Sequence, residues 1–456
     1  MTSKELVLAA IECKKVERIP WIPFCGVHTG SLIGVTATEY LKSSEKMIAG
    51  LERAIELYRP DGLPIAFDLQ LEAEILGCDL NWSDDNPPAV ISHPLTEGTL
   101  TLEDLTVPRA TDGRIPLILE VTEILRRNHP ELALYGLITG PFTLALHLLG
   151  ADIFMKMFDD PEYVNRVMTF CSDVACEMSR FYIEKGCDVI ALVDPMTSQI
   201  GPTQFEEFCT PHCRRIFDYI RSMNAKGSFF VCGHAQNNIE VMGDCHCDNI
   251  SIDENIPLDY VRDICIGKGI SFGGNLQLTT TLLLGNEADC RIDAVECLQT
   301  GGSTGFLLAP GCDIAYATPS ANLQAVADLV HDKDQQEIAR ELARVKITED
   351  IELEKIDYHQ FSQVKIEVVT LDSEGCAPCQ YMMEAVSEAA AEFGDNVDCC
   401  EFKIKTPEGL SKMKALGLKN IPTTCIDGDV AFISFIPTKE KLVKRISEHV
   451  KAKQQL

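Results

Sequence analysis

The sequence predicts an α/β protein in two parts, a closed (β/α)8 TIM barrel over residues 1–332 and a smaller α/β domain over residues 364–456. Eight short β-rich runs alternate with helical patterns in the first part, which is typical of a parallel sheet. A charged stretch without aromatic residues, Asp328 to Lys355, indicates an exposed helix and connector, so we expect a linker at 333–363. The charge balance then changes, from 28 basic and 55 acidic residues before position 364 to 12 and 14 after it.

Each β-rich run is expected to form one strand of the barrel. The runs are Ile19 to Cys25, Leu63 to Asp68, Leu132 to Thr139, Asp188 to Asp194, Ser228 to Cys232, Asn249 to Asp253, Ile270 to Asn275 and Phe306 to Pro310. Eight units over this length fit a closed barrel better than an open doubly wound sheet. The segment Asn81 to Pro108 fits neither period and is expected to be an inserted hairpin or loop.

The smaller domain is expected to alternate strands and helices as well. Strands are predicted at Lys365 to Leu371, Asp398 to Ile404 and Val430 to Phe435, and helices at Cys376 to Phe393, Pro407 to Leu416 and Lys439 to Val450.

Composition narrows the classes of partner. The chain has 40 Lys and Arg against 69 Asp and Glu, which disfavours nucleic acid and an acidic membrane surface. The 20 cysteines are not needed as disulfides in a chain that is 46% hydrophobic, and the start shows no signal peptide, so we expect a cytoplasmic protein with reduced thiols. The most apolar segment, Leu132 to Phe154, is interrupted by Gly, Pro and His, and no membrane span is predicted. The oligomeric state stays open.

Residues capable of chemistry follow most of the predicted strands. Because all carboxyl ends of a barrel open on one face, these residues are expected to line one pocket. The alternative is that strand ends are polar because loops begin there. The residues are Cys25, His28, Asp68, Thr139, Asp194, Cys232, His234, Asp253, Asn275 and Cys312.

Cys232, His234 and Cys312 are the candidate metal ligands. Cys-X-His can point two ligands into the mouth if the chain bends at Gly233, and Cys312 follows the last predicted strand. Zinc accepts sulfur and nitrogen, and catalytic sites keep one position open. The alternative is an unreactive buried cysteine beside a satisfied histidine. For a second cluster, Asp244 to Asp248, we favour a structural role, with His246 facing away from Cys245 and Cys247.

Residues 1 to about 330 resemble the uroporphyrinogen decarboxylase family, and within it the methylcobamide:coenzyme M methyltransferase branch. The resemblance rests on Glu72 to Cys78, Thr139 to Thr143, Cys232-Gly233, Ser251 to Glu254, Gly274-Asn275 and Leu308 to Cys312. It implies a TIM barrel, a zinc ion, a corrinoid that carries the methyl group, and a role in one-carbon metabolism such as methanogenesis. Asp253 and Asn275 are the residues expected to contact the corrinoid.

The sequence departs from the family pattern at several positions. The arginines that hold the acidic porphyrin in the decarboxylases are missing, since that stretch here is Phe24 to Thr29. Asp68 matches the decarboxylase aspartate, but His147 stands in place of a tyrosine. Phe230 occupies the usual histidine position of the methyltransferase zinc motif, so His234 or His28 is expected to supply the nitrogen ligand, or metal binding is altered.

Cys376-Ala377-Pro378-Cys379 lies at a predicted helix start, where the macrodipole stabilises a thiolate on Cys376. Pro422 is the X-Pro expected to be cis beside this pair. The domain resembles a thioredoxin or glutaredoxin. The alternative for this cysteine pair is a zinc knuckle, which would require a second paired-cysteine motif.

The resemblance therefore leads us to expect a zinc-dependent methyltransferase with a fused thiol-redox domain. It implies methyl transfer from a corrinoid-carrying partner protein to a small thiol such as coenzyme M, or conceivably to a thiol of the attached domain. Asp68, His147 and Asp194 are expected to handle protons or to support the site. The alternatives are a non-catalytic corrinoid-binding or redox-reactivation module and, third, a tetrapyrrole decarboxylase.

Overall fold

The structure is a computed structural model of the chain, and it describes residues 1–346, 357–416, 418 and 421–454. The chain forms two compact units, Met1–Val345 and Lys346–Leu456, each described here by itself. The middle of the predicted linker, residues 347–356, lies outside the described residues.

The first unit is built on a parallel sheet in the order β1-β4-β5-β6-β7-β8-β9. Its strands are β1 (Gly62–Pro64), β4 (Ala133–Thr139), β5 (Val189–Val193), β6 (Lys226–Val231), β7 (Asn249–Ile252), β8 (Ser271–Leu276) and β9 (Phe306–Pro310). Seven of the eight predicted runs thus contain a strand. Nearly all their residues are buried, which is why they are continuous apolar runs without alternation.

The predicted first strand, Ile19 to Cys25, is reduced to an isolated bridge at Trp21 that closes the barrel. The N–H of Leu308 in β9 donates to the carbonyl of Pro20 over 3.0 Å, and the N–H of Asp61 beside β1 donates to the carbonyl of Trp21 over 2.9 Å. A longer strand is not possible here because Pro20 and Pro23 have no N–H to donate.

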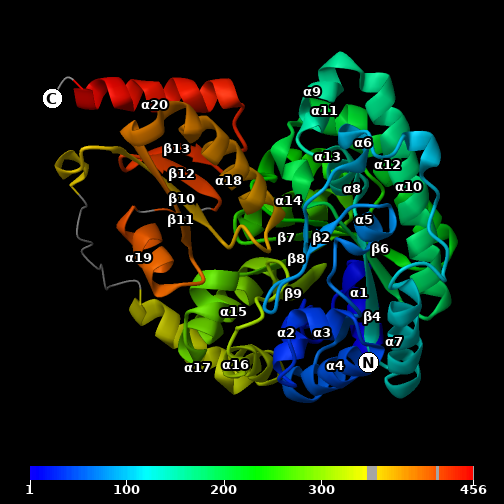
Figure 1. Cartoon of the computed structure of the whole chain (residues 1–456). Helices are drawn as coiled ribbons and strands as arrows, with labels where there is room; N and C mark the ends of the chain where they lie inside the picture. The colour runs from blue at the N-terminus through cyan, green and yellow to red at the C-terminus, as the bar shows by residue number, and fades with distance from the viewer. Residues whose placement is uncertain (347–356, 417, 419–420, 455–456) are drawn as a thin grey trace. The chain divides into compact units, whose positions relative to one another are not determined.

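Helices surround these strands, as Figure 1 shows. They are α1 (Ser3–Ile11), α2 (His28–Ser31), α3 (Ala37–Leu41), α4 (Ser44–Tyr58), α5 (Leu71–Ile75), α6 (Pro94–Glu97), α7 (Ile115–Asn128), α8 (Pro141–Leu149), α9 (Asp152–Asp159), α10 (Pro161–Glu184), α11 (Pro202–Gln204), α12 (Thr210–Ser222), α13 (Ile239–Gly243), α14 (Leu258–Lys268), α15 (Glu287–Gly301), α16 (Ser320–His331) and α17 (Lys333–Lys346). Helix α1 packs against β1, β4, β8 and β9, and its Lys4 N–H donates to the carbonyl of Glu131, just before β4 begins. It therefore lies at the amino-terminal end of the barrel and leaves the carboxyl ends open for a site.

The predicted excursion at Asn81 to Pro108 contains a short antiparallel hairpin, β2 (Leu80–Asn81) with β3 (Ala89–Val90). In the described part of the chain no single helix has the length and apolar composition of a membrane span. Helices α8 and α9 meet that test only as a pair, bent by 102°, and every residue of α8 is buried.

The second unit is a four-stranded mixed sheet in the order β11-β10-β12-β13, in which only β10 and β11 are parallel. Its strands are β10 (Val364–Thr370), β11 (Val397–Lys403), β12 (Thr423–Ile426) and β13 (Asp429–Ile433), and its helices are α18 (Ala377–Ala390), α19 (Pro407–Ala415) and α20 (Lys439–Gln454). Ile366 and Val368 pack with α18 and α20 on one face, while Val369 packs with Met413 of α19 on the other. The predicted elements are present, and β12 is an additional strand.

Candidate functional site

Two thiols meet at the carboxyl-terminal mouth of the barrel. Cys232 follows β6 directly, and Cys312 stands two residues after β9. Strands β6 and β9 are separated in the sheet by β7 and β8, so the two cysteines come together across the mouth. Their Sγ atoms are 2.9 Å apart. Both residues are partly exposed, in contrast to most other cysteines of this unit.

Two glycines allow this approach. Gly233 has φ +80°, a left-handed turn that reverses the chain after Cys232, and its N–H donates to the Asp253 carboxylate over 2.6 Å. At Gly311, a Cβ would lie 2.4 Å from Glu254 Oε2 and 2.9 Å from the Cα of Asp253. The turn before Cys312 can therefore press against the end of β7 only because residue 311 has no side chain.

Aromatic rings fill the barrel interior around the thiol pair. Phe230 is fully buried and makes edge-to-face contacts with Phe24 and Phe67, at centroid distances of 5.0 and 5.8 Å. Cys232 and Cys312 pack against this cluster. Phe230 is thus a core residue, and the position that the family resemblance assigns to a histidine ligand is closed to metal binding.

The charges around the thiol pair are acidic. Contact with the Cys312 thiol, followed by burial, raises the pKa of Cys232 well above its ordinary value, and Asp253 and Glu254 add to the shift. Burial raises the pKa of Asp253 to about 6 and that of Glu254 to about 8. Glu254 Oε2 is buried and has no hydrogen-bond partner among the described residues. A cation at the mouth would stabilise these groups in their charged forms.

The structure distinguishes between the two candidate nitrogen ligands. His28 is buried, and both ring nitrogens are engaged: Nε2 lies 2.7 Å from the Tyr58 hydroxyl, and Nδ1 donates to the carbonyl of Tyr316 over 3.2 Å. His234 stands two residues from Cys232, and its buried Nε2 has no partner in the described part of the chain. Burial lowers the pKa of His234, which favours the neutral imidazole that metal ligation requires. His234 is therefore the better candidate.

The donor set fits zinc in its chemistry, although the full predicted triple is not assembled. No group of three His, Cys, Asp or Glu side chains is arranged to hold a metal within residues 1–346 or the described part of the second unit. Two of the three predicted ligands are together, and the sulfurs would have to separate from 2.9 Å to about 3.8 Å to fit a tetrahedral ion with Zn–S bonds of about 2.3 Å. His234 as third ligand stays a prediction.

Asp68 lies near the mouth and is held by a cation that the sequence did not reveal. Its carboxylate pairs with Arg114 at 2.5 Å, and the same guanidinium contacts Glu74 at 2.8 Å. Arg114 precedes α7 and lies over the ring of Trp82 from the inserted hairpin. This ion pair compensates the Asp68 charge, so the carboxylate is not free to bind a cationic group of a substrate.

The other two predicted catalytic residues, His147 and Asp194, are also buried. Both ring nitrogens of His147 lack hydrogen-bond partners among the described residues, and burial, followed by the charge of His93, lowers its pKa to about 3. Asp194 accepts hydrogen bonds from the N–H groups of Phe142 and Thr143 at 3.0 and 2.8 Å and so caps α8. These contacts give Asp194 a structural reason for its position, and the catalytic roles of both residues stay predictions.

Asn275 and Asp253, the predicted corrinoid contacts, are linked to each other. The side-chain amide of Asn275 donates to the carbonyl of Asp253 over 3.2 Å and to that of Ile256 over 2.9 Å. Asn275 and Glu254 also line a cavity of about 640 Å³. The Asn275 amide thus fixes the loop after β7, and its contact with a corrinoid stays a prediction.

The second cysteine cluster is structural, as predicted. Cys245 and Cys247 are buried and donate to the carbonyls of Val241 and Met242. His246 is exposed and pairs with Asp218 at 2.9 Å. The segment is a turn with His246 at φ +66°, and not the extended chain on which the prediction was based.

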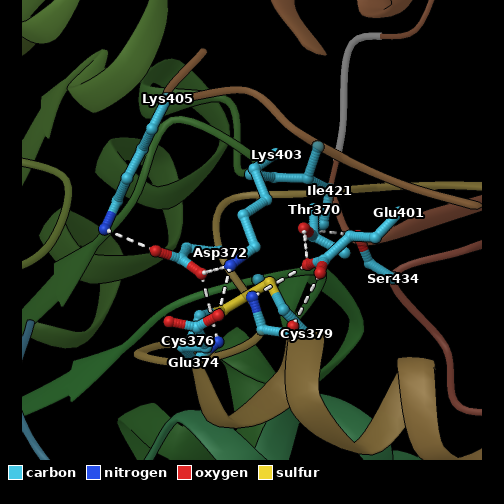
Figure 2. The surroundings of a disulfide bond; sticks show 12 residues. Thr370, Asp372, Glu374, Cys376, Cys379, Glu401, Lys403, Lys405, Ile421 and Ser434 are labelled. Atoms are coloured by element: carbon cyan, nitrogen blue, oxygen red, sulfur yellow. Dashed lines mark hydrogen bonds and ion pairs between the residues drawn. A yellow bond between two sulfur atoms is a disulfide. The ribbon is translucent and has the colours of Figure 1, made fainter. Parts of the chain in front are cut away.

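The second unit contains a disulfide between Cys376 and Cys379 at the start of α18, with Cα atoms 5.2 Å apart. Figure 2 shows the ion pairs that hold its surroundings, in which Lys403 lies 2.8 Å from both Asp372 and Glu374. Burial lowers the pKa of Lys403, but these hydrogen bonds outweigh it and the pKa stands above its ordinary value.

The peptide bond before Pro422 is cis, as predicted. Its loop is held by Ser434, whose hydroxyl donates to the carbonyl of Ile421 over 3.0 Å (Figure 2). Cys379 is fully buried, whereas Cys376 is partly exposed. A partner disulfide can therefore reach Cys376 first.

Comparisons with known proteins agree with this geometry. A family model described as uroporphyrinogen decarboxylase matches residues 2–333, and one described as a thioredoxin domain matches residues 364–447. Methylcobamide:CoM methyltransferase MtbA of Methanosarcina acetivorans is 30% identical over 334 residues, which cover 72% of this chain and 97% of that protein. Methylcobamide:CoM methyltransferase MtaA of Methanosarcina barkeri is 28% identical over 71% of this chain and 96% of its own.

A solved structure described as a methyltransferase from Methanosarcina mazei has 25% sequence identity and a TM-score of 0.67, over 73% of this chain and 98% of its own. Its match covers about the same share of the chain as the first family model. The chain therefore belongs to the uroporphyrinogen decarboxylase family and carries a thioredoxin domain after the family's barrel.

Proposed function

We propose that the protein transfers a methyl group from a methylated corrinoid, carried by a partner protein, to a thiol such as coenzyme M. The observation that carries the proposal is the Cys232 and Cys312 pair, two soft donors 2.9 Å apart at the barrel mouth. Relatives whose names give a methylcobamide and coenzyme M as substrates are 28 to 30% identical over almost their whole length, which supports this pair of substrates.

Cys232, Cys312 and His234 would hold a zinc ion in this proposal. Zinc, when bound, lowers the pKa of an acceptor thiol and so makes its thiolate available at neutral pH. Asp253 orients Cys232 by accepting the N–H of Gly233. The aromatic cluster around Phe230 excludes water on the interior side of the thiols.

The groups around the mouth would support the reaction without touching the methyl group. Asp68 is positioned by Arg114. Burial keeps the His147 imidazole neutral, so His147 would support the site through its packing in the last turn of α8. Asn275 would orient the corrinoid through the loop after β7.

The test combines metal analysis with an assay of methylcobalamin demethylation, followed by absorbance with coenzyme M, homocysteine and cysteine as acceptors. We expect about one zinc per chain and demethylation that depends on both the thiol and the metal. The variant Cys312→Ser should lose both. A matched control is Cys176→Ser, a partly buried cysteine on α10. Thiol-dependent demethylation at the wild-type rate in Cys312→Ser would contradict the proposal.

A second candidate is a module that docks the corrinoid protein and delivers electrons to it without methyl transfer. It is favoured by the Cys376–Cys379 disulfide and by the lack of a three-ligand metal group in the described residues. The two candidates differ in the corrinoid spectrum. Loss of the methyl group in the presence of a thiol indicates the transferase, and a Cys376-dependent change in cobalt oxidation state indicates the module.

A further inference from the structure

The thiol pair at the barrel mouth is arranged for redox chemistry as well as for ligation. A disulfide has an S–S bond of about 2.05 Å, so the sulfurs of Cys232 and Cys312, now at 2.9 Å, need to approach by only about 0.9 Å. The chain offers no other partly exposed pair of free thiols in direct contact within the described barrel residues.

A second thiol pair in the barrel provides a contrast. Cys213 and Cys245 interact through their side chains, but both are fully buried. Cys232 and Cys312 are partly exposed, and each has a glycine as its chain neighbour, Gly233 and Gly311. An oxidant or an attacking thiolate can therefore reach the mouth pair and is excluded from the buried one.

The second unit has the complementary chemistry. Cys376 is partly exposed at the start of α18 and Cys379 is fully buried, so Cys376 is the attacking thiol and Cys379 the resolving one. The ion pairs of Lys403 with Asp372 and Glu374 fix the loop in front of Cys376. The methyl transfer proposed above gives this dithiol no substrate.

We infer that the dithiol of Cys376 and Cys379 reduces a disulfide between Cys232 and Cys312. That disulfide forms when hydrogen peroxide oxidises the two mouth thiols: the S–S bond forms, the O–O bond breaks, and two waters are released. The Cys376 thiolate attacks one sulfur, a mixed disulfide forms, and the other barrel sulfur leaves as a thiolate and takes a proton. Cys379 then attacks Cys376, which releases the second barrel thiol and closes the Cys376–Cys379 disulfide.

Two electrons thus pass from the second unit to the barrel pair, and a small dithiol restores the reduced second unit. This activity would return the two sulfurs to the state in which they can bind a metal, so it deepens the proposed function and rests on it for its biological purpose. The exchange reaction itself can be tested without methyl transfer.

The experiment uses the full chain, freed of divalent metal with a chelator and oxidised with hydrogen peroxide. In Cys379→Ser the resolving thiol is missing, and we expect unreduced peptide mass spectrometry to find Cys376 joined to Cys232 or Cys312. In the wild type, dithiothreitol should reduce the Cys232–Cys312 disulfide about tenfold faster than in Cys376→Ser. The matched control is Cys400→Ser, a substitution of an exposed cysteine in the same unit as Cys376. In this variant the Cys232–Cys312 disulfide should be reduced at the wild-type rate.

Two results would overturn the inference. One is that Cys232 and Cys312 remain free thiols after oxidation. The other is that dithiothreitol reduces the Cys232–Cys312 disulfide in Cys376→Ser as fast as in the wild type. Both are independent of the transferase assay, because they are read from thiol and disulfide content. A protein that passes this test but shows no thiol-dependent demethylation would refute only the methyl transfer.

Discussion

Gly311→Ala is expected to separate the two mouth thiols. A Cβ at this position would lie 2.9 Å from the Cα of Asp253 and 3.0 Å from the backbone N of Glu254, whereas ordinary contacts begin at 3.4 Å. The Glu254 side chain can move away, but the two backbone atoms lie in the segment that directly follows β7. The turn that carries Cys312 must therefore shift by roughly half an ångström, and such overpacking costs about 1–3 kcal/mol of the free energy of unfolding.

Both tryptophans of the chain, Trp21 and Trp82, lie in the first unit, so intrinsic fluorescence during urea unfolding reports the barrel alone. In Gly311→Ala we expect unfolding at a lower urea concentration and less bound zinc. We also expect hydrogen peroxide to oxidise Cys232 and Cys312 to a disulfide more slowly. The matched control is Gly267→Ala in α14, where a Cβ meets nothing within 4 Å. Alanine should stabilise that helix by about 0.5–1 kcal/mol. A Gly311→Ala protein with the wild-type midpoint and disulfide rate would show that the close approach of the turn after β9 to the segment after β7 is not what pairs the thiols.

Three further predictions follow from the site. Cys312→Ser should lower the zinc content sharply, measured by metal analysis, whereas retention of all zinc would exclude Cys312 as a ligand. His147→Leu should flatten the acid dependence of stability: the folded-state pKa of His147 is about 3 against an ordinary 6.5, so between these values the unfolded state binds more protons and stability decreases as the pH is lowered. The slope of the unfolding free energy near pH 5 should drop by about 1.4 kcal/mol per pH unit, and an unchanged slope would contradict the burial argument. Uroporphyrinogen should be neither bound tightly nor decarboxylated, because Phe24 to Thr29 contain no arginine and Asp68 is paired with Arg114. Detectable turnover of uroporphyrinogen would favour the tetrapyrrole decarboxylase over the methyltransferase.

The strands of the barrel could be predicted from the sequence because each is buried on both faces and is therefore a short apolar run. The errors occur at prolines. Pro20 and Pro23 leave a single bridge where a strand was expected, and β1 ends at Pro64 although the apolar run continues to Phe67. In the second unit β12 is a strand beyond those predicted, and Asp427-Gly428 is the two-residue turn signal that indicates its hairpin with β13.

Partners distant in sequence could not be predicted. Arg114 reaches Asp68 across 46 positions, from the first residue before α7, and no periodicity or motif indicates that contact. The engagement of both His28 nitrogens by Tyr58 and Tyr316 was hidden for the same reason. By contrast, the proximity of Cys232 and Cys312 could be predicted from the sequence, since both follow strands of one barrel and all carboxyl ends of a barrel face the same side.

Phe230 restricts where a nitrogen ligand of the proposed zinc site could come from. Its ring packs against Phe24 and Phe67 inside the barrel, so a strand position that the family resemblance gives to a ligand is occupied by core packing. In the proposed zinc site the nitrogen would then come from His234, which stands after the left-handed turn at Gly233 and outside the strand. A ligand on a loop is held less rigidly than one on a strand, so we expect metal to exchange more readily here. If the proposed site releases its metal, two thiols 2.9 Å apart are left open to oxidation, and the inferred reduction by the thioredoxin domain would restore them.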